Sequence, residues 1–178
     1  DIDIDFGNEE EDFSWLSDFP VTDNEIEEAY ENKSLRVIYQ SNNFFLPQLS
    51  DLVQGRDIIN IRPEYQRRLR WSRKQKSLLI ESLLLNIPVP PVFFYESDMA
   101  RYEVMDGQQR INAIHEFLNN HFSLFGLEEL HFLNKKSYRD LPPKVKRGLY
   151  RASISATVLL KETIQDAKDP YQVRRYVF

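Results

Sequence analysis

Cysteine is absent from the 178-residue chain, and histidine is scarce, with three residues. A chain without cysteine has no disulfide framework and no thiolate nucleophile or metal ligand. The three histidines are scattered along the sequence, which disfavours a zinc site, because such sites usually gather ligands at short spacings. These absences fit a reducing compartment, and we expect the protein to be cytoplasmic.

Long apolar runs and several catalytic motifs are also missing. No apolar run approaches the roughly 20 residues that a membrane-spanning helix requires. The acidic start DIDIDFGNEEEDF is unlike a secretory signal peptide, which has a basic start and an apolar stretch. There is no Walker A motif, no GxGxxG, no HExxH and no paired-carboxylate pattern. We therefore expect no membrane partner and disfavour P-loop enzymes, dinucleotide enzymes and zinc proteases.

Charge divides the chain into two parts. Residues 1–31 contain 13 of the 28 Asp and Glu and no Lys or Arg, so residues 32–178 carry 15 acids against 23 bases, a net charge of +8. A basic body suits a polyanionic partner. We expect residues 1–31 to be an acidic tail that is largely disordered or docks through its aromatic residues, and residues 32–178 to form one domain. These aromatic residues are Phe6, Phe13, Trp15 and Phe19.

Hydrophobic periodicity predicts a mixed α+β fold for residues 32–178. Ser72 begins the clearest helical pattern, with Gln75 at the capping-box position, and Asp106 is expected to cap a second helix. A helix that opens at Asp169 is unfinished at the last residue, which suggests the N-terminal part of a longer protein. The expected strands are residues 92–97, 101–105 and 153–162, and the expected short helices are residues 49–57 and 143–150. We also expect extended pieces at 34–40 and 44–47 on either side of an Asn-Asn turn. Residues 121–133 are expected to form a hairpin.

The stretch DGQQR, residues 106–110, has the composition of an anion site. Gly107 lets the backbone approach a ligand closely, and the first N–H groups of the following helix would be free to bind phosphate. Gln108 and Gln109 add neutral donors and acceptors, and Arg110 adds a fork that can grip two oxygens. Asp106 could cap the helix and pair with Arg110, or hold a metal ion that bridges phosphates, or orient a water. The alternative is a polar first turn that simply meets water.

A second stretch, IRPEYQRRLRWSRKQK at 61–76, interleaves bases with aromatic residues. This composition suits phosphates and stacked bases. Cations at a helix N-terminus are unfavourable unless anions compensate, which weakens the alternative of a solvated basic face. The candidate nucleic-acid contacts are Arg68, Arg70, Arg73, Lys74 and Lys76. A further basic patch, KVKRGLYR at 144–151, has the pattern of a solvated helix face, and His115 that of a satisfied core residue.

These stretches resemble a known family. RPEYQRRLRW, then LIESLLLNIPVPPVFFYE, then VMDGQQRINAIHEF resemble the N-terminal domain of GmrSD-type modification-dependent restriction systems, a branch of the ParB/sulfiredoxin-like superfamily. The likeness runs from about residue 48 to the end. The usual continuation of the motif, LTT, is replaced here by Ile111, Asn112 and Ala113, a change on the helix rather than in the motif.

The resemblance implies a compact domain with a small mixed sheet, in which the DGQQR helix and a YQR stretch face a nucleoside triphosphate. Asp106 to Arg110 would be the nucleotide motif, and Tyr65, Gln66 and Arg67 its facing wall. Family members are taken to hydrolyse nucleotides with a divalent metal and to couple this to a C-terminal nuclease. This chain contains no nuclease motif, so the nuclease would be a C-terminal or separate domain.

The leading hypothesis is a nucleotide-binding regulatory domain of a DNA-targeting restriction or phage-defence protein. Whether it hydrolyses NTP stays open; if it does, Asp106 and Arg110 are the candidate catalytic residues, with Asp106 holding Mg²⁺. One rival is a non-catalytic DNA-binding module that uses the basic stretch. Another is a protein-interaction domain that uses the acidic tail.

Overall fold

The computed structural model describes residues 22–33, 39–59 and 70–160. The chain divides into two units, residues 1–35 and 36–178. In the first unit, helix α1 spans Asp23–Lys33. Thr22 and Glu25 cap its start reciprocally: the Thr22 N–H and hydroxyl donate to Glu25 Oε2, and the Glu25 N–H donates to Thr22 Oγ1.

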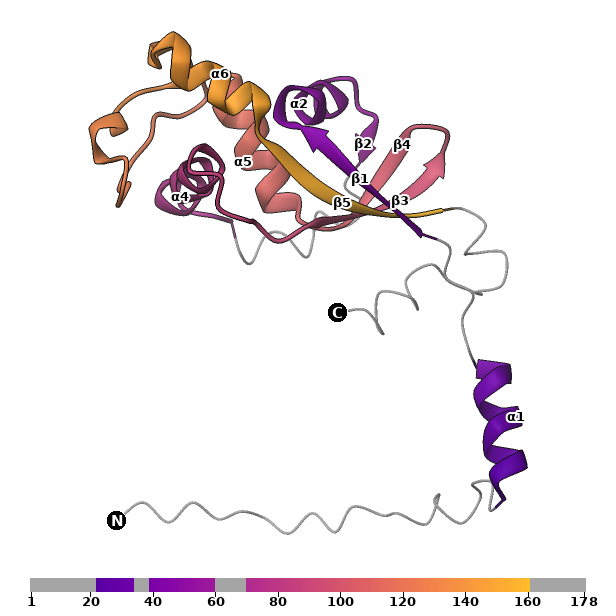
Figure 1. Ribbon diagram of the computed structural model, residues 1–178. Coiled ribbons are helices and arrows are strands. Elements are labelled where there is room, and N and C mark those ends of the chain that lie inside the picture. The colour runs from indigo at the N-terminus through magenta and orange to yellow at the C-terminus, as the bar shows by residue number, and fades with distance from the viewer. Residues whose placement is uncertain (1–21, 34–38, 60–69, 161–178) are drawn as a thin grey trace, which may run out of the picture. The chain divides into compact units, whose positions relative to one another are not determined.

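The second unit is built on a five-stranded mixed sheet with the order β1-β5-β3-β4-β2 (Figure 1). β1 pairs with β5 and β3 with β4 in antiparallel fashion, whereas β3–β5 and β2–β4 are parallel. Together with its helices, this sheet confirms the expected α+β class. The strands are β1 (Tyr39–Phe45), β2 (Ile58–Ile59), β3 (Val92–Asp98), β4 (Arg101–Asp106) and β5 (Ser153–Leu159).

One face of the sheet carries the core. Along β5 the buried residues Ile154, Ala156 and Val158 alternate with the exposed Ser153 and Ser155, as period-two geometry requires of a half-covered strand. The helices α2 (Leu46–Gln54), α4 (Arg73–Leu84), α5 (Gln108–Leu118) and α6 (Pro143–Arg151) pack against one another and the sheet. None of the helices in the described ranges is long and apolar enough to span a bilayer.

The predicted start of α4 is confirmed. Ser72 Oγ accepts from the Gln75 N–H at 3.2 Å, and Gln75 Oε1 accepts from the Ser72 N–H at 2.8 Å. Both bonds of a capping box are therefore present, and they satisfy donors that a helix end leaves unpaired. The remaining predicted elements at 92–97, 101–105, 143–150 and 153–162 correspond to β3, β4, α6 and β5, with boundaries shifted by a few residues.

Three local predictions are wrong. The extended piece expected at 44–47 ends at Phe45, because Leu46 begins α2. Asn42 and Asn43 do not form a turn but lie inside β1, paired with Ala156 and Ser155 of β5. Residues 121–133 do not form a hairpin: they are bends that end in the 3-10 turn η2 (His131–Leu133), followed by η3 (Tyr138–Asp140). The sequence pattern of this segment is strand-like, but several of its backbone N–H groups donate to side chains of α4, and Leu124 pairs with the backbone of residues 135 and 136.

A polar row on α4 holds this segment in place. Ser77 Oγ accepts from the Phe125 N–H at 3.0 Å. Glu81, although buried, accepts from the backbone N–H groups of residues 128, 129 and 130 at 3.0 to 3.5 Å. The row Arg73, Ser77 and Glu81 has i, i+4, i+8 spacing, which places all three on one helix face. A buried carboxylate is tolerated here because several donors compensate its desolvation.

Candidate functional site

The DGQQR turn joins the end of β4 to the start of α5. Gly107 adopts φ 99°, the left-handed region that residues with a side chain avoid. A Cβ built there would lie 2.5 Å from Val92 Cγ1 on β3 and 3.1 Å from Arg110 Nη2. The requirement for glycine is therefore explained by the turn and by close packing on β3. The ligand approach expected from the sequence is not needed to account for it.

Asp106 does not cap α5, so that prediction is wrong. The N-cap is Gly107, which has no side chain to accept a bond, while Asp106 is the last residue of β4. The predicted partner is confirmed: Asp106 Oδ2 lies 3.6 Å from Arg110 Nη2 one turn along the helix. Asp106 is half-exposed, so its carboxylate orients the guanidinium and still faces solvent.

Arg110 is largely enclosed by its neighbours. Its side chain is only 15% exposed, and Nη2 donates to the Pro91 carbonyl at 2.8 Å. Nε is buried and has no hydrogen-bond partner. A buried donor without an acceptor costs about 1–3 kcal/mol. The guanidinium is thus fixed between Asp106 and the segment before β3, with one donor unsatisfied.

The two glutamines face different neighbours. Gln108 Nε2 donates to Asn112 Oδ1 at 2.9 Å, and its Oε1 is buried without a partner. Asn112, which departs from the usual LTT continuation, therefore orients an amide of the motif. Gln109 Oε1 accepts from the Trp71 N–H at 3.3 Å. This bond joins the motif to the end of the basic stretch, at the entrance to α4.

The first turn of α5 has backbone donors without acceptors in the helix. The first intrahelical bond runs from the Ile111 N–H to the Gly107 carbonyl. The N–H groups of residues 108 to 110 therefore have no acceptor within the helix, and they lie at the positive end of its dipole. The Arg110 fork lies beside them, so negative charge would be stabilised by the backbone and a cation together.

The bases at the start of α4 have intramolecular partners. Arg73 donates from Nε to the Ser123 carbonyl at 2.6 Å and from Nη2 to the Ser123 hydroxyl. Lys74 lies 3.8 Å from Glu128, and Lys76 Nζ lies 2.5 Å from Glu116 Oε2. These groups compensate the positive charge that is unfavourable at a helix N-terminus. Of the predicted nucleic-acid contacts, the described residue left exposed without such a contact is Arg70.

Other candidates fall outside the site or outside the described residues. Tyr65, Gln66, Arg67 and Arg68 lie outside the described residues. His115 Nδ1 lies 2.9 Å from Ser50 Oγ, which links α5 to α2 as expected of a satisfied core histidine.

A metal site formed by the protein alone does not occur in the described ranges, where no three His, Asp or Glu side chains cluster. Asp106 is then a single carboxylate at the turn. One carboxylate could hold Mg²⁺ only if phosphate oxygens and water supplied the other ligands of the ion.

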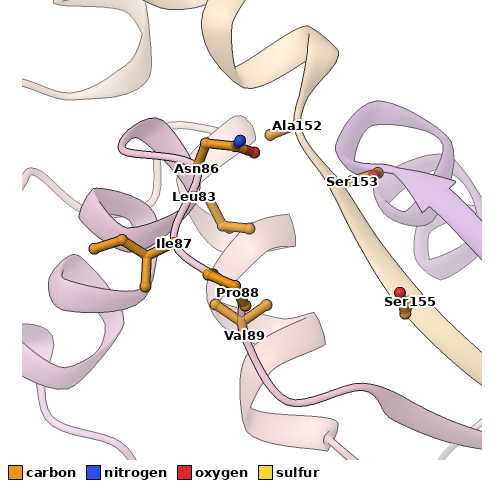
Figure 2. Close-up of a pocket in the computed structure, with 8 residues that line it drawn as sticks. All are labelled: Leu83, Asn86, Ile87, Pro88, Val89, Ala152, Ser153 and Ser155. Atoms are coloured by element: carbon orange, nitrogen blue, oxygen red, sulfur yellow. The ribbon is translucent and has the colours of Figure 1, made fainter.

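A separate pocket of about 270 Å³ lies between the α4–β3 connection and β5. Figure 2 shows Asn86, Ile87, Pro88 and Val89 on one side, with Ser153 and Ser155 of β5 on the other. Its lining contains no charged side chain and no residue of the DGQQR turn, so it does not suit phosphates. The sequence reasoning missed this pocket, because the connection and β5 are more than 60 residues apart.

Two further contacts were missed in the sequence. The Pro91 carbonyl that accepts from Arg110 gives no signal, because every residue has a carbonyl. The Gln108–Asn112 bond could have been found, because residues four apart on a helix are neighbours.

A family model described as GmrSD restriction endonuclease, N-terminal domain, matches residues 49–177. No curated protein and no solved structure matches the chain. The matched range includes α4, the DGQQR turn, α5 and β5, and it covers most of the sequence. The chain therefore belongs to the family of GmrSD restriction endonuclease N-terminal domains and is part of a restriction protein.

Proposed function

We propose that the DGQQR turn binds the phosphates of a nucleoside triphosphate and that the domain uses this to regulate its restriction protein. The observation that carries the proposal is the Arg110 guanidinium, held by Asp106 and the Pro91 carbonyl near the first turn of α5, whose N–H groups before Ile111 have no acceptor within the helix. Guanidinium and free amides together match phosphate oxygens in charge and in hydrogen-bond geometry.

Each residue of the turn has a distinct role in this proposal. The amides of residues 108 to 110 cradle phosphate oxygens, and Arg110 binds them through its fork. The buried Nε of Arg110 and Oε1 of Gln108 lack partners; a bound nucleotide that draws these side chains outward would relieve that cost. Asp106 would hold Mg²⁺ in company with the phosphates, and the ion would neutralise charge on them. If hydrolysis occurs, Asp106 and Arg110 lie nearest to the phosphates.

The proposed regulation passes through Gln109. Its bond to the Trp71 N–H connects the first turn of α5 to the entrance of α4. Phosphates that fix α5 residues 108 to 110 would bias the position of Trp71 at the entrance of α4, and with it the way the domain meets DNA or a nuclease domain. A ligand shifts such an equilibrium only if it contacts the two states differently, and the Gln109–Trp71 bond is a contact that can differ.

The test is titration calorimetry with ATP, GTP, CTP and UTP in the presence of Mg²⁺. Arg110→Ala should weaken binding of the preferred nucleotide at least about tenfold, since charge-assisted bonds contribute about 1.5–3 kcal/mol each. Arg101→Ala is the matched control, because Arg101 is an exposed base on β4 at the end away from the turn. Absence of binding by all four nucleotides to the wild-type chain, or equal affinity in both variants, would refute the proposal. Circular dichroism confirms that each variant is folded.

The rival role of a DNA-binding module on the basic stretch has weaker support. Arg73, Lys74 and Lys76 already contact Ser123, Glu128 and Glu116. A duplex would have to break these contacts before it could use the same charges.

A further inference from the structure

Helix α6 and the turn before it carry an excess of positive charge. Residues 131–151 contain seven Lys and Arg against one acid, Asp140. Asp140 Oδ2 accepts from the Ser137 hydroxyl at 2.6 Å and from its N–H at 3.1 Å. These two bonds lower the pKa of Asp140 below its usual value, and the bond from the Ser137 side chain has the larger effect. Asp140 caps η3, and the nearby charges of Arg139 and Lys136 add to the lowering of its pKa, although neither base lies within ion-pair distance of it.

Four of these bases form what we call the α6 cationic surface: Arg139, Lys144, Arg147 and Arg151. All four are exposed. Lys144, Arg147 and Arg151 have i, i+3, i+7 spacing and therefore share one helix face, while Leu149 on another face is fully buried. Arg139 lies shortly before α6, where its carbonyl accepts from Lys146 Nζ at 2.8 Å. None of the ion pairs found within 22–33, 39–59 and 70–160 involves any of the four.

The contrast with α4 decides which basic segment is available to a partner. On α4, Arg73, Lys74 and Lys76 are each engaged with the 116–128 region. On α6, Lys144, Arg147 and Arg151 are exposed, and none of them forms an ion pair within the described residues. Like charges held together on one face repel one another, and a polyanion that neutralises them would bind favourably. The basic patch at 144–151, whose sequence has the pattern of a solvated helix face, is thus more available to an anion than the bases of α4.

We infer that the α6 cationic surface docks on the phosphate backbone of duplex DNA, independently of the nucleotide proposal. From Lys144 to Arg151 the helix rises by about 10 Å, at about 1.5 Å per residue. A row of this length suits a line of phosphates better than one compact anion, because a duplex carries a charge about every 1.7 Å of its axis. The helix offers no Asn or Gln to read bases, so the contact is independent of sequence. A DNA partner agrees with the restriction family to which the chain belongs.

The test is binding of the full chain to a labelled random-sequence duplex, measured without nucleotide over a range of salt concentrations. Arg147→Ala/Arg151→Ala removes two charges from the surface. Arg56→Ala/Arg101→Ala is the matched control, because it removes two exposed arginines from the turn after α2 and from β4. The α6 variant should bind at least about tenfold more weakly at low salt, and the slope of log affinity against log salt should fall by about two. The control should keep the wild-type slope.

Two results would overturn the inference. One is a wild-type chain that binds no duplex at low salt. The other is an α6 variant with the same slope as the control. If the acidic residues 1–31 occupied the surface instead, the wild type would not bind duplex, and the α6 variant would change only the salt dependence of thermal unfolding. Circular dichroism and the unfolding midpoint verify that both double variants are folded.

Discussion

At the scale of single residues, Gly107 shows how a position in a ligand motif can be fixed by packing. Its φ of 99° and the 2.5 Å approach to Val92 are both incompatible with a side chain. Gly107→Ala should lower the free energy of unfolding by about 2–4 kcal/mol, the sum of backbone strain and overpacking. Urea denaturation followed by fluorescence measures it.

Gly148→Ala is the control for that substitution. Gly148 lies inside α6, and a Cβ there would make ordinary contact with Leu84 Cδ2 at 3.8 Å. Alanine favours a helix interior over glycine, so this change should stabilise by about 0.5–1 kcal/mol. If both substitutions cost little, the left-handed turn and the Val92 contact do not define the site as described.

The residue scale also shows what the sequence of the site could reveal. The Asp106–Arg110 pair was predictable because helical neighbours four apart interact. The sequence could not predict that Asp106 fails to cap α5, because a residue pattern does not distinguish the last residue of a strand from the N-cap of the helix that follows. The partners of Arg73 and Lys76 lie 50 and 40 residues away, so no local reading could show that these charges are already engaged.

At the scale of elements, Glu81 determines how the 121–133 segment packs on α4. Its carboxylate accepts three consecutive backbone N–H groups. Glu81→Gln keeps the shape but turns one acceptor into a donor that faces other donors. The unfolding free energy should fall by about 1–3 kcal/mol, and the amides of residues 128 to 130 should exchange with deuterium faster.

The control for this change is Glu128→Gln. Glu128 is exposed and lies 3.8 Å from Lys74, so its loss should cost less than about 1 kcal/mol. Equal losses in the two variants, or unchanged exchange at residues 128 to 130 in Glu81→Gln, would show that the segment is held by its apolar contacts alone.

The same scale explains which elements could be predicted. Helices α4 and α5 and strands β3, β4 and β5 have strong local signals: a capping box, helical spacing and alternation. The Asn42–Asn43 pair has the composition of a turn, but pairing with β5 places it in a strand. The parallel pairing of β3 with β5 joins segments separated by two helices, and local periodicity carries no signal for it.

At the scale of the whole chain, the separation of charge has a kinetic consequence. The chain has a net charge of −5, so the acids of residues 1–31 offset the positive field of the body when a polyanion approaches. Glu9→Gln/Glu10→Gln/Glu11→Gln/Asp12→Asn removes four negative charges, which changes the net charge from −5 to −1. The association rate constant with duplex DNA should rise several-fold at low ionic strength.

High salt separates this effect from a specific contact. At about 1 M salt the Debye length is about 3 Å, so the rates of the quadruple variant and the wild type should converge, while the fold, measured by circular dichroism, stays the same. Stopped-flow association over the salt range measures both limits. A difference that persists at high salt, or no difference at low salt, would contradict long-range screening by the acidic residues.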